Sequence, residues 1–173
     1  MTQNTHSTHS AAFYWILAAI SIVILTVLDQ ITKILAVSHL RNQPDVICIP
    51  GVLKLRYLEN RGMAFGMLEG KIPVFIILCL LFFCAFFYFY MRVPKQPYYL
   101  PLILSSIFMV SGALGNFTDR VFRGYVVDYI YFYLIDFPVF NLADIYVVCS
   151  GILLVILVCF KYTGEGDFGF LSW

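Results

Sequence analysis

Charged side chains are scarce in this sequence. Only 12% of its 173 residues are Asp, Glu, Lys or Arg, whereas 61% are hydrophobic and the mean hydropathy is +0.87. A soluble domain of this length has too little interior to bury so much apolar surface, so the composition predicts a single polytopic membrane domain covering residues 1–173. The net charge is only +1 and the basic residues do not cluster, which argues against a nucleic-acid partner.

Several common catalytic and metal-binding motifs are also missing. The three histidines form no HExxH motif, the five cysteines form no CxxC pair, and no serine lies in a GxSxG turn. These gaps argue against a metalloprotease, a serine hydrolase and a cysteine-based metal site. We therefore expect neither a metal ion nor a cofactor.

What the chain does have is long apolar stretches. Four of them reach the length of about 20 residues that a helix needs to cross a bilayer. They cover about residues 11–38, 73–91, 98–115 and 142–160. The first has no basic segment before it and no small-residue cleavage site after it, so we interpret it as a retained transmembrane helix and not a cleaved signal peptide.

The connections between these stretches differ in length and pattern. Two long loops, about residues 39–72 and 116–141, hold most of the polar residues. In the first loop, residues 51–59 alternate apolar and basic side chains, which predicts a small β element. In the second, residues 124–137 mix tyrosines with aliphatic residues, as segments at a membrane interface do. The expected fold is an all-α membrane protein with four transmembrane helices, a small extracytoplasmic β element and an interfacial loop.

Counting membrane crossings places both long loops on the same face of the bilayer. That face then collects Asp29 from the first helix, Asn60 from the first loop, Asp119 from the end of the third helix and Asp144 from the start of the fourth. A carboxylate at the edge of a bilayer core is costly unless it faces a protein interior or a wet cavity. The sequence therefore predicts one polar site.

Asp119 and Asp144 are the candidates for chemistry. Asp119 shares a helical stripe with Gly112 and Asn116, and Asp144 follows Asn141 by three residues. The structural alternatives are a solvated helix end for Asp119 and a capping box for Asp144. Two carboxylates that meet share a proton near neutral pH, so one can activate a water while the other polarises a carbonyl. We predict peptide hydrolysis by this pair without a covalent intermediate.

Other polar residues have plainer alternatives. Asp29 and Lys33 are spaced i, i+4, as in a salt bridge that stabilises one helix, and Asn60 is a possible turn residue before Gly62. Two other functions also fit buried acids. A small proton-coupled transporter would use them as a relay, and a membrane scaffold would use them as caps.

Five segments together resemble a known family, lipoprotein signal peptidase, the bacterial signal peptidase II. They occur in the family's order and span the chain from the first helix to the fourth. The segments are DQITK (residues 29–33), ENRGMAFGM (59–67), GALGNFTDR (112–120), GYVVDYI (124–130) and FNLAD (140–144).

This resemblance implies an intramembrane aspartyl endopeptidase. Its substrate would be a prolipoprotein whose cysteine carries diacylglycerol, cut on the N-terminal side of that cysteine. The resemblance implies that Asp119 and Asp144 are catalytic. It implies that the other matched residues bind substrate or support the site, namely Asp29, Lys33, Asn60, Gly62, Asn116, Arg120, Asn141 and Ala143.

The resemblance also implies a location and an inhibitor. The protein would lie in the bacterial cytoplasmic (inner) membrane among lipids, with its site at the periplasmic or outer face and both termini in the cytoplasm. A simple count of Lys and Arg gives the opposite orientation, because most of them lie on the face with the site. The peptide antibiotic globomycin is an expected inhibitor.

Overall fold

The computed structural model describes residues 10–62 and 72–172. Residues 63–67 of the segment that begins at Glu59 therefore lie outside the described residues. Four helices long and apolar enough to cross a membrane are present in the described part of the chain. The helices are α1 (Ala11–Leu40), α2 (Ile72–Arg92), α3 (Leu100–Phe122) and α4 (Leu142–Ile156), and a π-helical turn at Leu157–Lys161 prolongs α4. The expected four-helix membrane fold is confirmed.

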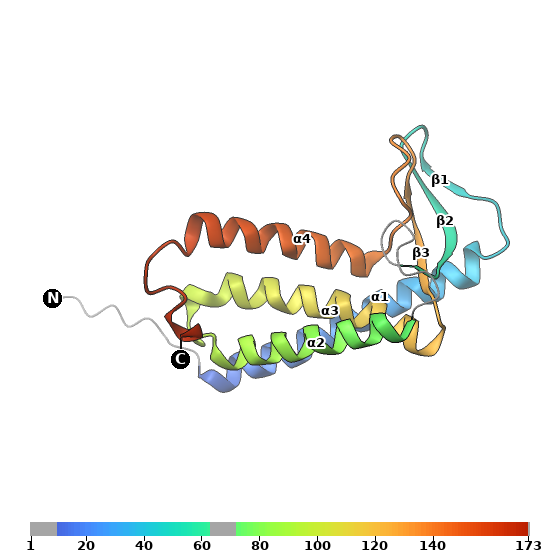
Figure 1. Ribbon diagram of the computed structural model, residues 1–173. Coiled ribbons are helices and arrows are strands. Elements are labelled where there is room, and N and C mark those ends of the chain that lie inside the picture. Colours follow the sequence, from blue (N-terminus) through green and yellow to red (C-terminus); the bar gives the residue numbers. More distant parts are fainter. Residues whose placement is uncertain (1–9, 63–71, 173) are drawn as a thin grey trace.

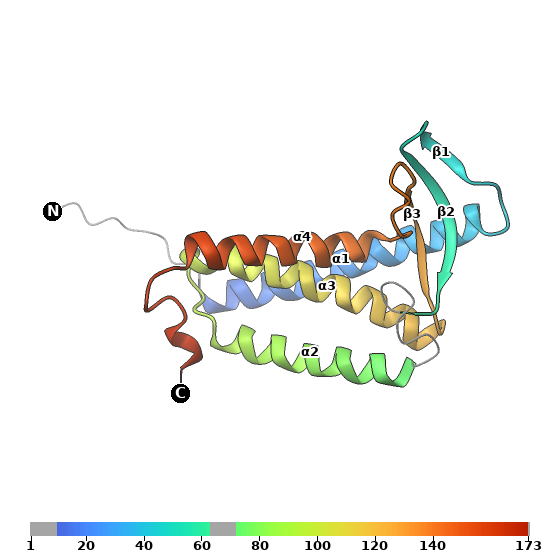
Figure 2. The ribbon, with the colours of Figure 1, turned by 45° about the horizontal axis from the view of Figure 1, so that its top comes forward.

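The four helices lie side by side, and a small sheet covers one end of the bundle (Figures 1 and 2). Helix α3 contacts each of the other three helices and is the most buried of them. The helices carry many exposed apolar side chains, such as Ile16, Leu81 and Val155, each more than half exposed. In a bilayer these side chains would face lipid, so outward apolar surface is expected here.

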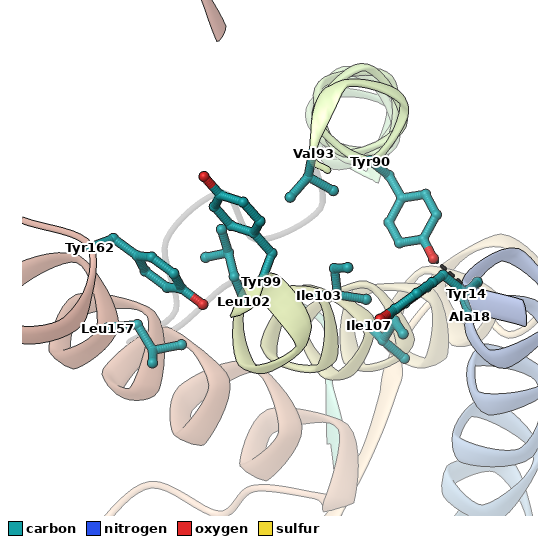
Figure 3. Packing of buried hydrophobic residues seen from close by; sticks show 10 residues of the cluster. All are labelled: Tyr14, Ala18, Tyr90, Val93, Tyr99, Leu102, Ile103, Ile107, Leu157 and Tyr162. Carbon is teal, nitrogen blue, oxygen red and sulfur yellow. Dashed lines mark hydrogen bonds between the residues drawn. The ribbon is translucent and has the colours of Figure 1, made fainter. Parts of the chain in front are cut away.

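A cluster of buried residues holds the opposite end of the bundle together. Figure 3 shows Tyr90 of α2 pointing at α1, where its hydroxyl donates to the backbone oxygen of Tyr14 at 2.6 Å. Tyr99 and Tyr162 stack with their ring centroids 5.6 Å apart, which joins the start of α3 to the segment that follows α4. Ile103 of α3 is fully buried between these contacts. The helices are thus fixed far from the sheet as well as beneath it.

The sheet has three antiparallel strands in the order β1 (Val46–Ile49), β2 (Leu53–Asn60) and β3 (Val126–Phe132). The β element expected in the first long loop is therefore confirmed. The second long loop was expected to be an interfacial segment, and within it residues 126–132 form a third strand, β3, against β2. This run is rich in β-branched and aromatic residues that suit a strand, and its pairing partner lies far away in the sequence.

Helix α3 also differs from expectation. Its apolar stretch ends near residue 115, but the helix continues to Phe122. Asn116 and Asp119 therefore lie on one helical stripe, as expected, whereas the loop expected to begin at residue 116 begins after the end of the helix. The extension remains helical because these polar side chains find partners inside the protein instead of requiring water.

Candidate active site

The predicted polar residues meet at the sheet end of the bundle. Asp29 and Lys33 come from α1, Asn60 from the end of β2, Asp119 from α3 and Asp144 from the start of α4, and Figure 1 shows these segments converging. Counting membrane crossings predicted that these residues share one face of the bilayer. In the structure, hydrogen bonds join them into one network.

Asp144 does cap α4, as the structural alternative proposed. The Asn141 side chain accepts a hydrogen bond from the Asp144 backbone N–H at 3.0 Å, and the Asn141 N–H donates to Asp144 Oδ2 at 3.1 Å. The other oxygen, Oδ1, accepts from Asn116 Nδ2 at 2.7 Å. Capping therefore leaves this carboxylate facing α3, held by two donors in a fixed position.

Lys33 lies at the centre of the buried network and is fully enclosed. Its Nζ is 2.9 Å from Asp29 Oδ2 and 3.2 Å from Asp119 Oδ2, and it donates to Asn116 Oδ1 at 2.9 Å. The predicted salt bridge between Asp29 and Lys33 within α1 is present. Lys33 also ties α1 to α3 through Asp119 and Asn116. A buried ammonium with three oxygen partners is compensated, whereas one left without them would destabilise the fold strongly.

Asp29 links the same network to α4. Its Oδ1 accepts from the backbone N–H of Ala143 at 3.0 Å, in the first turn of that helix. Gly115 leaves room for this carboxylate, because a Cβ there would collide with Asp29 Oδ2. Ala143 is fully buried. Both residues thus serve the close packing of α1, α3 and α4 beneath the site.

Asp119 is enclosed in a different way from Asp144. It is 1% exposed, its Oδ2 contacts Lys33 and accepts from the Val127 backbone N–H at 3.1 Å, and its Oδ1 lies 3.2 Å from Arg123. Its carboxylate is therefore held between two cations and the backbone of β3. Asp119 lines neither of the two cavities that border Asp144. This geometry suits a residue that ties α3 to the sheet better than one that activates water.

Asp128 is the residue that sequence reasoning missed. It lies on β3, is 1% exposed, and accepts from Asn60 Nδ2 at 2.8 Å and from Asn141 Nδ2 at 2.6 Å. Burial, followed by the nearby charge of Asp144, raises the pKa of Asp128 to about 6. The signal was an acid inside the apolar run VVDYIYF, within a segment already matched to the family.

Asn141 brings Asp128 and Asp144 together. Its backbone N–H donates to Asp144 while its side-chain amide donates to Asp128, so one residue holds both carboxylates. Both acids also line the same cavity of about 290 Å³, together with Asn60, Asn116 and Arg120. Asn141 itself is fully buried, which fixes this arrangement.

A second cavity, of about 440 Å³, continues from Asp144 into the bundle. It shares Asn116, Arg120 and Asp144 with the first cavity and is otherwise lined mainly by apolar side chains of α2, α3 and α4. The combined space therefore has a polar end with two carboxylates and an apolar end within the span. Such a space fits a ligand that is partly peptide and partly hydrocarbon.

Arg120 forms one wall where the two cavities meet. Its guanidinium donates to the Gly62 carbonyl at 2.8 Å and lies 3.9 Å from the centre of the Phe75 ring. Gly62 is also bound through its N–H to Asn60 Oδ1 at 3.1 Å. Arg120 thus positions the chain just after β2. No group of three metal-ligating side chains among the described residues is arranged to hold a metal ion.

Comparison with known proteins gives a consistent family. The family model described as signal peptidase (SPase) II matches residues 21–160. The lipoprotein signal peptidase of Streptococcus thermophilus (strain CNRZ 1066) is 42% identical over 143 residues, which cover 82% of this chain and 91% of that protein. The lipoprotein signal peptidase of Clostridioides difficile (strain 630) is 41% identical over 139 residues, covering 80% and 92%.

Solved structures agree with the sequence comparison. A bacterial membrane enzyme determined by the in meso method at 2.3 Å resolution is similar with a TM-score of 0.75 and 31% identity, covering 86% of this chain and 92% of that one. A second such structure, at 1.9 Å, has a TM-score of 0.74 and 32% identity, with coverages of 84% and 94%.

Proposed function

The chain belongs to the signal peptidase II family, and on that premise we propose that it removes the signal peptide from prolipoproteins, using Asp128 and Asp144 to activate water. It is a multi-pass membrane protease. The named relatives are peptidases, so the comparisons give no support to the transporter alternative.

The observation that carries the choice of residues is the double contact of Asn141. This side chain and its backbone hold Asp128 and Asp144 at one cavity, whereas Asp119 is ion-paired behind it. The pair expected from the sequence was Asp119 with Asp144. The geometry favours Asp128 as the partner of Asp144 and gives Asp119 a supporting role.

The proposed reaction uses the shared proton of the pair. The ionised carboxylate takes a proton from a water, whose oxygen attacks the carbonyl carbon of the scissile peptide bond, and the protonated carboxyl donates to the carbonyl oxygen. The tetrahedral intermediate then collapses as the leaving nitrogen is protonated. The raised pKa of Asp128 favours it as the acid at the start of the cycle. The proton belongs to the coupled pair, so the two roles exchange during turnover.

The two cavities suit a diacylglyceryl-modified cysteine next to the cut bond. The peptide would lie in the polar cavity beside Asn60, Asn116 and Arg120, and the cut would fall on the N-terminal side of the lipidated cysteine. A lipid chain would extend into the apolar cavity that begins at Asp144. We place the protein in the bacterial cytoplasmic (inner) membrane, with the sheet and site at the periplasmic or outer face and both termini in the cytoplasm.

A cleavage assay on three isosteric variants tests the catalytic pair. With a diacylglyceryl-modified prolipoprotein in detergent, Asp128→Asn and Asp144→Asn should each lose at least about 100-fold in rate, the loss typical of a missing acid or base. Asp128→Asn should keep its Tm or raise it, because the ionised acid is costly where it lies.

Asp119→Asn is the matched comparison in this assay. It should lower the Tm, because Lys33 and Arg123 both lose an ionic partner. An inactive Asp119→Asn at the wild-type Tm, together with an active Asp128→Asn, would return the catalytic role to Asp119.

Globomycin is proposed as an inhibitor because a peptide antibiotic that occupied the polar cavity would block access to both carboxylates. Processing should stop as globomycin is titrated into the assay, and an Arg120→Ala variant, with an altered cavity wall, should need more of it. Unchanged processing at saturating globomycin would refute the proposal.

A further inference from the structure

The free end of the sheet is apolar and exposed. We call this part the sheet tip, and its described members are between 47% and 66% exposed, namely Ile47, Ile49, Leu134, Ile135 and Phe137. Ile47 and Ile49 lie on β1, and the other three lie in or beside the turn after β3. The turns after β1 and β3 meet, since the Leu134 N–H donates to the Val52 carbonyl and Tyr133 contacts the Gly51 N–H. Large apolar side chains that gather at one exposed end of a protein usually mark an interaction site.

The sheet tip lies where a bilayer surface would be. Figures 1 and 2 both show the sheet reaching sideways past α4, with its tip away from the bundle and level with the start of that helix. The start of a membrane-spanning helix marks one edge of the hydrocarbon core. The lipid that surrounds the exposed side chains of α4, such as Val148 and Ile152, would therefore extend beneath the sheet tip.

The side chains next to the sheet tip have the composition of a membrane interface. Lys54 lies over the rings of Tyr131 and Tyr133, each 5.1 Å from its centroid, and Arg56 lies 4.7 Å from that of Tyr131. Asp45 pairs with Lys54 at 2.7 Å, so the local charge is partly balanced. Tyrosine with long basic side chains is typical of the headgroup level, where an aromatic body meets lipid and a charged end meets water.

We propose that the sheet tip is inserted in the headgroup region of the bilayer beside α4, so that lipid is the partner that covers it. Strand β3 carries Asp128 and leads directly into the turn that holds Leu134 and Ile135. Lipid contact at the tip would thus brace the strand that positions Asp128. This consequence rests on the proposed function, whereas the contact with lipid does not.

Photocrosslinking in phospholipid nanodiscs tests the contact directly. A benzoylphenylalanine placed at Ile135 should give, after irradiation, an intact protein mass increased by one phospholipid. The same residue at Gln43, an exposed position in the turn after α1, should give no adduct, because Figure 1 shows this turn farther from the middle of the bundle than the sheet. A protein with no lipid adduct at Ile135 or Leu134, or with crosslinks to a second copy of the chain instead, would overturn the proposal.

A charged substitution tests the consequence for Asp128. Ile135→Asp should abolish the lipid adduct of a probe at Leu134 and reduce prolipoprotein cleavage in nanodiscs, whereas Gln43→Asp should change neither. If the adduct is lost but cleavage is unchanged, the tip contacts lipid without bracing the site. If the protein with the probe at Ile135 forms the adduct but wild type cleaves no substrate, the proposed function fails and the lipid contact stands.

Discussion

At the scale of single residues, two asparagines organise the site. Asn116 accepts from Lys33 and donates to Asp144, and Asn141 donates to both Asp128 and Asp144. Each carboxylate oxygen that these amides reach is an acceptor, so the network orients the acids without adding charge beside them. Two cations lie nearby: Lys33 is paired with Asp29 and Asp119, and Arg120 lines the cavity that Asp128 and Asp144 share.

The pH dependence of cleavage follows from Asp128. The pKa of Asp128 is raised to about 6 by burial and by the charge of Asp144, and the proposed reaction needs one proton on the pair. We expect kcat/KM to fall as the pH rises through about 6, because kcat/KM reports the free enzyme. The folded state binds this proton more tightly than the unfolded chain. The contribution of the protonated Asp128 to the free energy of unfolding therefore falls as pH rises from about 4 to about 6.

Asn60 provides the matched variant for this pH profile. Its hydrogen bond to Asp128 lowers the pKa, so Asn60→Ala should move the descending limb to higher pH. Asn42→Gly is a suitable control, because this exposed turn residue has a positive φ of 59° that glycine adopts freely. If kcat/KM of Asn60→Ala falls at the same pH as that of the wild type, a group other than Asp128 titrates.

At the scale of elements, α3 and α4 approach closely where the site is built. A Cβ at Gly112 would collide with the Ala143 carbonyl oxygen and lie 2.8 Å from Val147 Cγ2. Glycine at such a crossing lets two helical backbones pack together. The contact sets the height of the first turn of α4, and therefore of Asp144 relative to Asn116.

Replacing Gly112 should separate these helices. Gly112→Ala should cost about 1–3 kcal/mol, as overpacking usually does, and should reduce cleavage, because the backbone carbonyl it meets cannot rotate away. Gly151→Ala on α4 is the matched control, since the nearest atom to its Cβ is Met109 Cε at an ordinary 3.7 Å. Thermal unfolding and the cleavage assay measure both effects, and equal Tm values for the two variants would contradict this account.

At the scale of the whole molecule, two arguments give opposite orientations in the membrane. The count of Lys and Arg places the sheet in the cytoplasm, whereas the family resemblance places it outside. The count stands against the proposed orientation, although several cations on the sheet side are paired in the structure. Lys54 and Arg56 contact Asp45, while Arg41 and Arg61 contact Glu59. The rule counts Lys and Arg in short loops and is not a rule of net charge, so these ion pairs do not remove the conflict, and the proposed orientation rests on the family resemblance.

Labelling of cysteines in intact cells tests the proposed orientation. A membrane-impermeant maleimide should label Cys48, which is exposed on β1, if the sheet lies outside. A Thr163→Cys substitution at the other end of the bundle, in a Cys48→Ser background, should be labelled only after the membrane is permeabilised. The reverse pattern would place the sheet in the cytoplasm and the family-based orientation would be rejected.

The sequence by itself determined the class, the four spans and the face on which the polar residues gather. The length of each apolar stretch is a local property of the sequence, and counting the stretches tells on which side of the membrane each loop lies. Together they identified a membrane bundle with Asp29, Asn60, Asp119 and Asp144 at one end. The capping box of Asn141 and Asp144 and the salt bridge of Asp29 and Lys33 were also readable, because each pair lies within one helical turn.

Only the tertiary structure decided which acids share a cavity. Asp119 is nine positions before Asp128, and both stand in matched segments, so sequence spacing could not choose between them. The pairing of β3 with β2 brings Asp128 to Asn60 and Asn141, while the path of α1 brings Lys33 to Asp119. Contacts between segments that are far apart in the chain are fixed by packing, and packing is what separates the supporting acid from the proposed catalytic one.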